Sequence, residues 1–162
     1  MRRNASIIIA IAAALIVIGG VVFAYERYFG SQTVLQTNSD STHCRQGNIF
    51  EGVDRQARFA VLSTCEHAIG IVHDMKGTRE EDGDYQFNLQ VEEPFKKLLS
   101  NENAKQVNGM LVVEIIPKDQ NLSDVQIPKS GDKIEVYGAW VTDNPHGWNE
   151  IHPAWQVKVL GR

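Results

Sequence analysis

The sequence lacks the signatures by which many enzymes and nucleic-acid-binding proteins are found. Its 162 residues contain no G-x-S-x-G segment and no glycine-rich loop that would cradle phosphate groups. Acidic residues outnumber basic ones by 20 to 16, the net charge is −4, and no basic cluster follows the N-terminus. Nucleic acid is therefore not an expected partner, because its binding depends on neutralising phosphates.

Long hydrophobic runs are also absent, with one exception near the N-terminus. Residues 7–24 carry no charge and no strongly polar side chain, which is about the length that a membrane-spanning helix needs. The preceding Arg2 and Arg3 favour leaving residues 1–6 in the cytoplasm. We therefore expect a transmembrane anchor over residues 7–25, with the rest of the chain on the outer side of the cell membrane.

A cleaved signal peptide is the alternative for this segment, because Val22-Phe23-Ala24 resembles a small-residue cleavage site. Either interpretation exports the remainder of the chain. Residues 26–43 are rich in polar side chains without hydrophobic periodicity, which favours a flexible tether. The remaining stretch, residues 44–162, has a length that suits one extracytoplasmic domain.

Cysteine is scarce, since Cys44 and Cys65 are the only two. In an exported domain such a pair favours a disulfide over a metal site. The bond would close a loop of about 20 residues and contribute roughly 3 kcal/mol in the chain-entropy model. The alternative combines the two thiols with His43 and His67 as metal ligands, but these spacings match known zinc sites poorly.

The pattern of residues 44–162 predicts a mainly β domain. Tyr85 to Val91 alternates cleanly between apolar and polar side chains, and a short helix is expected to begin at Pro94 and to fray over residues 101–103. The last strand is expected to point Ile151, Trp155, Val157 and Val159 inward. The other expected strands are 58–63 and 67–75 (or one coiled strand broken at Cys65), 110–116 and 133–142. Five strands with one short helix favour a small Greek-key barrel of the OB type, with a β-sandwich as the alternative.

The segment from His146 to Pro153 is the densest group of chemically capable side chains. Glu150 and His152 are two residues apart on an expected strand, so their side chains should leave the same face. His146 lies in the preceding turn and could fold back to meet them. Together these three residues could hold a divalent metal and leave a coordination position open. The alternative is a structural hydrogen-bonding network of Trp148, Glu150 and His152.

A second acidic group precedes the strand at Tyr85. Asp82 and Asp84 offer hard oxygen ligands, but the glycine and glutamate positions of a calcium loop are missing. A solvated hairpin tip is therefore the expected role of this group. Asp84 is kept as a candidate ligand-binding residue beside Trp148, His146, Glu150 and His152.

Several of these motifs resemble those of an uncharacterised family of small exported or membrane-tethered prokaryotic domains. The resemblance spans roughly residues 58–160 and rests on four segments: Val61-Leu62-Ser63-Thr64-Cys65, Asp82-Gly83-Asp84-Tyr85-x-Phe87-x-Leu89, Val112-Val113-Glu114-Ile115-Ile116-Pro117, and Gly138-x-Trp140-Val141-x-Asp143 with His146-Gly147-Trp148-x-Glu150-Ile151-His152-Pro153. The family implies an OB-like barrel and supplies no activity, cofactor or catalytic residue. Related sequences often carry histidine at the position of Gln86, so a metal site that includes this position is in doubt here.

The expected function is that of a non-enzymatic binding or accessory module. It would meet a membrane-protein or cell-surface partner through the corner from Trp148 to His152, without a cofactor. One alternative is a metal-dependent hydrolase that uses His146, Glu150 and His152. Another is a structural subunit of a membrane complex, in which the anchor makes the main contacts.

Overall fold

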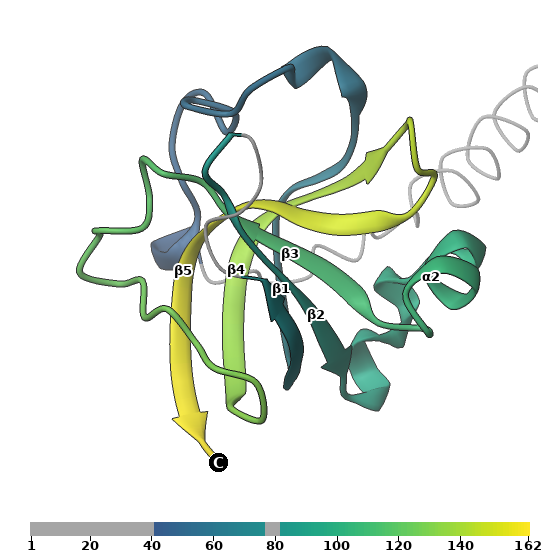
Figure 1. Cartoon of the computed structure of the whole chain (residues 1–162). Coiled ribbons are helices and arrows are strands. Elements are labelled where there is room, and N and C mark those ends of the chain that lie inside the picture. The colour runs from purple at the N-terminus through teal and green to yellow at the C-terminus, as the bar shows by residue number, and fades with distance from the viewer. Residues whose placement is uncertain (1–40, 77–81) are drawn as a thin grey trace, which may run out of the picture. The chain divides into compact units, whose positions relative to one another are not determined.

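The computed structural model of the chain describes residues 41–76 and 82–162 (Figure 1). The expected anchor over residues 7–25, and most of the expected tether, lie outside these ranges. Within the described ranges, no helix has the length and apolar character required to cross a bilayer.

Five strands make up most of the described chain: β1 (Phe59–Lys76), β2 (Tyr85–Val91), β3 (Leu111–Ile115), β4 (Lys133–Asp143) and β5 (Asn149–Gly161). The described helical segments are short: η1 (Ser41–His43), η2 (Gln56–Arg58), η3 (Glu93–Leu98) and α2 (Asn101–Gln106). The prediction of a mainly β domain is confirmed.

The strands are hydrogen-bonded in the order β1-β2-β3-β5-β4, and β4 pairs with β1, so that the sheet closes on itself (Figure 1). All neighbours are antiparallel except β3 and β5, which run parallel with Val112 opposite Glu150. This parallel pair places β3, which carries Glu114, beside β5, which carries His152. The closed order therefore determines which polar side chains meet.

The first strand is a single element of 18 residues rather than two. Its register with β4 shifts on both sides of Ser63, close to the expected break at Cys65. The first part of β1 pairs with β4, and from Gly70 onward β1 also pairs with β2. Glycine at position 70 allows the backbone of β2 to approach closely. A Cβ atom at Gly70 would lie 2.4 Å from the carbonyl oxygen of Gln90.

The helix prediction is confirmed in part. A short helical segment with Pro94 in its first turn is present, but it is the 3₁₀ segment η3, and the α-helix begins only after Ser100, where fraying was expected. The reason is a capping box, in which the Ser100 side chain accepts hydrogen bonds from the backbone N–H groups of Glu102 and Asn103. The Asn103 side chain in turn accepts from the Ser100 backbone N–H. Helix α2 lies between β2 and β3, the interval in which the sequence predicted a helix.

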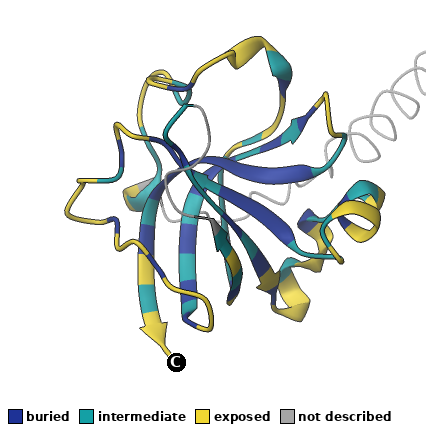
Figure 2. Cartoon of the chain, viewed as in Figure 1, coloured by how far each residue is buried: buried dark blue, intermediate teal, exposed yellow. Residues whose placement is uncertain are grey.

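The buried hydrophobic side chains form two clusters. Figure 2 shows that buried residues, in dark blue, run along the strands of the sheet. The larger includes Phe87, Leu89, Val113, Ile151 and Val157, and confirms the alternation expected in β2. The smaller cluster comprises Val53, Phe59, Ile116, Ala139, Val141 and Trp155. Trp155 was expected to face the same way as Val157, but the register between β4 and β5 shifts around Gly138 and places it in the smaller cluster.

The expected disulfide between Cys44 and Cys65 is present, with 5.6 Å between the two Cα atoms. It attaches the segment before η2 to β1. The end of the expected tether is also packed on the domain, since His43 Nδ1 lies 2.7 Å from Gln156 Oε1 and the His43 carbonyl accepts from Trp155 Nε1. The packed domain therefore includes His43, one residue before its expected start at Cys44.

Replacing both cysteines with serine should lower the free energy of unfolding by about 3 kcal/mol, because the bond closes a loop with a sequence separation of 21. Urea denaturation followed by tryptophan fluorescence measures this change. Dithiothreitol should destabilise the wild-type chain and leave the double variant unaffected. Equal midpoints for the oxidised and reduced wild type would contradict the prediction.

Candidate functional site

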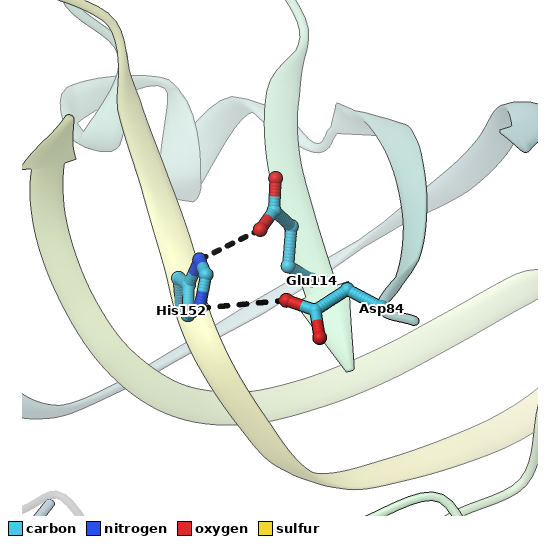
Figure 3. Close-up of side chains that lie close together, drawn as sticks. All are labelled: Asp84, Glu114 and His152. Carbon is cyan, nitrogen blue, oxygen red and sulfur yellow. Dashed lines mark ion pairs between the residues drawn. The ribbon is translucent and has the colours of Figure 1, made fainter. Parts of the chain in front are cut away.

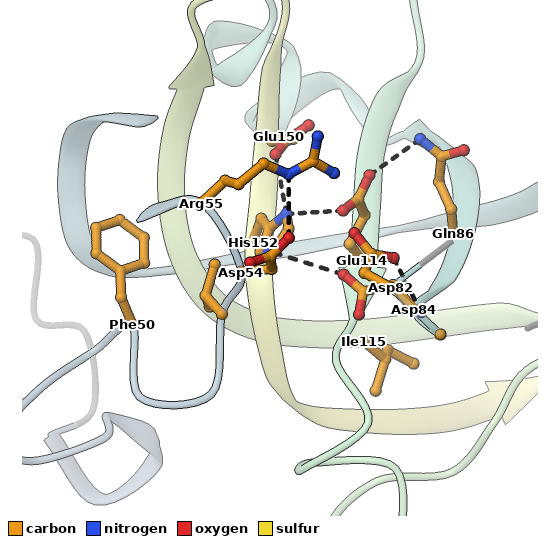
Figure 4. Close-up of polar contacts among 12 residues, drawn as sticks. Phe50, Asp54, Arg55, Asp82, Asp84, Gln86, Glu114, Ile115, Glu150 and His152 are labelled. Atoms are coloured by element: carbon orange, nitrogen blue, oxygen red, sulfur yellow. Dashed lines mark hydrogen bonds and ion pairs between the residues drawn. The ribbon is translucent and has the colours of Figure 1, made fainter. Parts of the chain in front are cut away.

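Glu150 and His152 lie at the start of β5 on the side of the sheet that faces the smaller cluster. The prediction that their side chains leave the same face is confirmed, because Glu150 Oε1 lies 3.1 Å from His152 Nδ1. Both are buried, with exposed fractions of 1% and 4%. Phe59 covers the imidazole at a ring distance of 4.6 Å, and Phe50 stacks on Phe59. The segment before β1 therefore closes over this part of the barrel wall (Figure 4).

Glu114 joins this pair from the neighbouring strand β3. Its Oε2 lies 2.8 Å from His152 Nδ1, and its Oε1 accepts a hydrogen bond from Gln86 Nε2 at 3.0 Å. The imidazole nitrogen thus faces two carboxylates at once, those of Glu114 and Glu150. The sequence prediction overlooked Glu114, although it is the only charged residue in the apolar run from Met110 to Ile116.

Asp84 approaches the other side of the imidazole from the residues just before β2 (Figure 3). Its Oδ2 lies 3.7 Å from His152 Nε2. Asp84 is 4% exposed and so does not belong to a solvated hairpin tip, as had been expected. His152 Nε2 is itself buried and has no hydrogen-bond partner.

The surroundings of this cluster change the pKa values of its members. Burial alone would lower the pKa of His152, but its hydrogen bonds with Glu114 and Glu150 outweigh burial and raise the pKa to about 10. Burial raises the pKa of Asp84 to about 7, against the opposing charge of His152. Burial also raises the pKa of Glu150. For Glu114, burial is outweighed by the hydrogen bond and charge of His152, so its pKa lies below the ordinary value.

A second ionic group lies beside the first, around Asp143 at the end of β4. Arg58 donates from Nε to Asp143 Oδ1 at 3.0 Å and from its terminal nitrogen to Oδ2, which makes a bidentate pair. His146 Nδ1 also contacts Asp143 Oδ2. Burial would raise the pKa of Asp143, but the hydrogen bonds with Arg58 and His146 lower it. Arg58 was not among the residues expected at the site.

The turn between β4 and β5 presents an aromatic pair, which we call the aromatic shelf: His146 and Trp148. Their rings stack at 4.1 Å with an angle of 5° between the planes. Trp148 Nε1 donates to Glu150 Oε2 at 2.8 Å, and the His146 carbonyl accepts from Gln106 Nε2 at 2.8 Å. The side chain of His146 is 44% exposed, so the shelf joins the buried cluster to the surface.

The residues expected to form one metal site are therefore divided between two groups. Glu150 and His152 are in contact, whereas His146 is bound to Asp143 and stacked on Trp148. Within the described ranges, the three side chains whose ligand atoms lie within 4.8 Å of one another are Asp84, Glu114 and His152. Two carboxylates and one imidazole are a donor set that first-row transition metals accept.

The expected network of Trp148, Glu150 and His152 is also present, since Glu150 bonds both other residues. Of the predicted ligand-binding residues, Glu150 and Asp84 each lie beside the imidazole of His152. Trp148 reaches them through Glu150, and His146 lies on the far side of Trp148.

A scan against protein-family models, a search of curated proteins and a search of solved structures each found no match for this chain.

Proposed function

We propose that this chain is a membrane-tethered, extracytoplasmic OB-like module that binds a protein or cell-surface partner and does not catalyse a reaction. In this proposal residues 7–25 form the anchor, residues 1–6 remain in the cytoplasm, and the barrel lies outside. The aromatic shelf of His146 and Trp148 is the binding element.

The strand order supports the OB-like assignment. Five strands in the order β1-β2-β3-β5-β4, with a long β1 that pairs with both β2 and β4, suit a small Greek-key barrel. Barrels of this type use the β2–β3 face and the loops flanking it for binding. In this chain the β4–β5 turn, which carries the shelf, is one of those loops.

The burial of the ionisable side chains favours binding over catalysis. The side chains of Asp84, Glu114, Glu150 and His152 are 1–14% exposed and are engaged with one another. A substrate therefore meets the shelf and not the groups that could transfer a proton. The side chains below the shelf hold it in place, because Asp143 fixes His146 and Glu150 fixes Trp148. An aromatic surface held by buried partners binds with little loss of side-chain entropy.

The hydrolase hypothesis receives less support from the geometry. It requires His146, Glu150 and His152 to share one metal, whereas His146 is committed to Asp143. An export-dependent role is supported independently by the Cys44–Cys65 disulfide, because such bonds persist in oxidising compartments.

Cross-linking in native membranes tests the binding proposal. A photoreactive amino acid at Asn144, which is exposed beside the shelf, should give a discrete cross-linked species with the full-length chain. His146→Ala should reduce the yield by at least about fivefold, since aromatic contacts at interfaces are worth about 1 kcal/mol or more. Lys158→Ala, exposed at the other end of β5, serves as the matched control and should not change it. An absent species, or one that His146→Ala leaves unchanged, would argue against the proposal.

A further inference from the structure

The imidazole of His152 has one nitrogen that the protein leaves without a hydrogen bond. Nε2 is buried, the side chain is 5% exposed, and the nearest charged atom is Asp84 Oδ2 at 3.7 Å. A buried polar atom without a partner costs free energy and is uncommon in folded proteins. The hydrogen bonds of Nδ1 do not explain why Nε2 is buried without a partner.

The separation of 3.7 Å between Nε2 and Asp84 Oδ2 suits a shared cation better than a direct bond. It exceeds the donor–acceptor distance of a hydrogen bond, which is about 2.7–3.2 Å. Two ligand atoms that each lie about 2.1 Å from one metal ion can be up to about 4.2 Å apart. Glu114 belongs to the same group, since one ligand atom from each of the three residues lies within 4.8 Å of the others. Its Oε2 now lies 2.8 Å from Nδ1, so the carboxylate has to turn to provide the third ligand atom beside Nε2.

The other ring nitrogen, Nδ1, has a carboxylate partner, as is usual for a histidine that binds a metal through Nε2. Glu150 Oε1 lies 3.1 Å from Nδ1 and stays there if the Glu114 carboxylate turns toward the cation. A carboxylate on one imidazole nitrogen fixes the tautomer and leaves the lone pair of the other nitrogen available to a metal. Trp148 donates to the second oxygen of Glu150 and so fixes this carboxylate in turn.

The side chains around the ring carry more acidic than basic groups, which favours binding of a divalent cation. Four largely buried carboxylates face two cationic groups, Arg58 and a protonated His152; the carboxylates are Asp84, Glu114, Asp143 and Glu150. Arg58 is already committed to Asp143 in a bidentate pair. A cation of charge +2 held by Asp84, Glu114 and neutral His152 would be balanced by its two carboxylate ligands.

We propose that Asp84, Glu114 and His152 Nε2 bind one divalent transition-metal cation, with Glu150 as the residue that positions the imidazole. The imidazole donor favours Zn²⁺ over Ca²⁺ and Mg²⁺, which prefer oxygen ligands alone. Figure 3 shows the three side chains, which come from the residues before β2, from β3 and from β5, so one cation would attach these three segments to one another. This inference goes beyond the proposed partner binding and does not depend on it.

The test uses the full-length chain in detergent, without a histidine tag and stripped with EDTA. Added Zn²⁺ should bind one per chain by elemental analysis and raise the melting temperature by about 5 °C or more. Asp84→Asn and Glu114→Gln should each weaken binding at least about tenfold, and Glu150→Gln about tenfold through the loss of orientation. Equimolar Mg²⁺ or Ca²⁺ should leave the melting temperature unchanged.

Two controls separate this site from other ligands. Asp119→Asn changes another buried carboxylate, one that pairs with Arg45, and His146→Ala removes the exposed histidine nearby; both variants should bind Zn²⁺ as the wild type does. Nitrogen-15 NMR of the wild type, which needs no variant, should show Zn²⁺ shifting Nε2 of His152 and not Nδ1. The proposal is overturned if the wild type binds no Zn²⁺, if His146→Ala alone abolishes binding, or if the His152 resonances do not move.

Discussion

Replacing His152 with leucine should lower the free energy of unfolding by about 3–5 kcal/mol at neutral pH, since removal of one partner strands the buried charges of the others. His152 Nδ1 contacts Glu114 at 2.8 Å and Glu150 at 3.1 Å, and both carboxylates are largely buried. Urea denaturation in EDTA measures the change. All three tryptophans lie between residues 140 and 155, so their fluorescence reports on this domain alone.

Glu150→Gln is the matched comparison for this variant. Its amide oxygen can still accept from Trp148 Nε1, and Glu114 still pairs with His152, so the loss should be about 1 kcal/mol. Lowering the pH to about 5 should reduce the cost of His152→Leu, because the stranded carboxyl groups then take up protons. A loss below about 1 kcal/mol for His152→Leu would show that the imidazole does not hold this cluster together.

The stability of the metal-free chain should fall by several kcal/mol as the pH rises from about 4.5 to 10, since each unit of pKa shift corresponds to about 1.4 kcal/mol. The pKa of Asp84 is raised from 3.8 to about 7, so the stability that its protonated form contributes is complete below 3.8 and is lost as the pH passes 7. The pKa of His152 is raised from 6.5 to about 10, so the contribution of the imidazolium is complete below 6.5 and is lost through 10.

Two other carboxyl groups act in the opposite direction at low pH. The pKa values of Glu114 and Asp143 are lowered from 4.5 and 3.8, so their contributions are lost as the pH falls below those values. Melting temperatures in EDTA across this range should therefore show a maximum at mildly acidic pH. Asp84→Asn should reduce the slope between 3.8 and 7, where the raised pKa of Glu150 still acts, and leave the decline above it. A wild-type melting temperature that rises between pH 6 and 9 would contradict the expected sign.

Much of the fold could be predicted because its strands carry strong local patterns. The alternation from Tyr85 to Val91 and the β-branched run before Pro117 each predicted a strand, and the structure has them as β2 and β3. The sequence predicted one helix from Pro94, whereas the structure has η3 and α2, because the cap at Ser100 begins a separate helix. Trp155 was misassigned because the shift in register around Gly138 cannot be read from periodicity.

The site could be predicted only in part, since it combines local and distant residues. Glu150 and His152 were paired correctly because i, i+2 spacing on a strand is a local rule. Glu114 could have been identified from its own context, since a carboxylate in a strand covered on both faces requires a partner. Arg58 and Asp143 are 85 residues apart in sequence, and only the pairing of β1 with β4 brings them together.

His146 was predicted to be a metal ligand only because a residue in the preceding turn could fold back toward Glu150 and His152. In the structure, the imidazole of His146 instead contacts Asp143, which lies three residues earlier at the end of β4. The aromatic stack on Trp148 then fixes the ring outward. The carboxylate of Asp143, three residues before His146, is the local feature that predicts this contact.

The location of the domain outside the membrane is the claim on which the proposed function depends, and thiol trapping in intact producing cells tests it most directly. Rapid alkylation followed by mass spectrometry should find Cys44 and Cys65 joined and unmodified, and protease added outside should cleave the barrel once any outer barrier is opened. Alkylation of both thiols, together with a barrel that is protected until the cell membrane is lysed, would contradict the account.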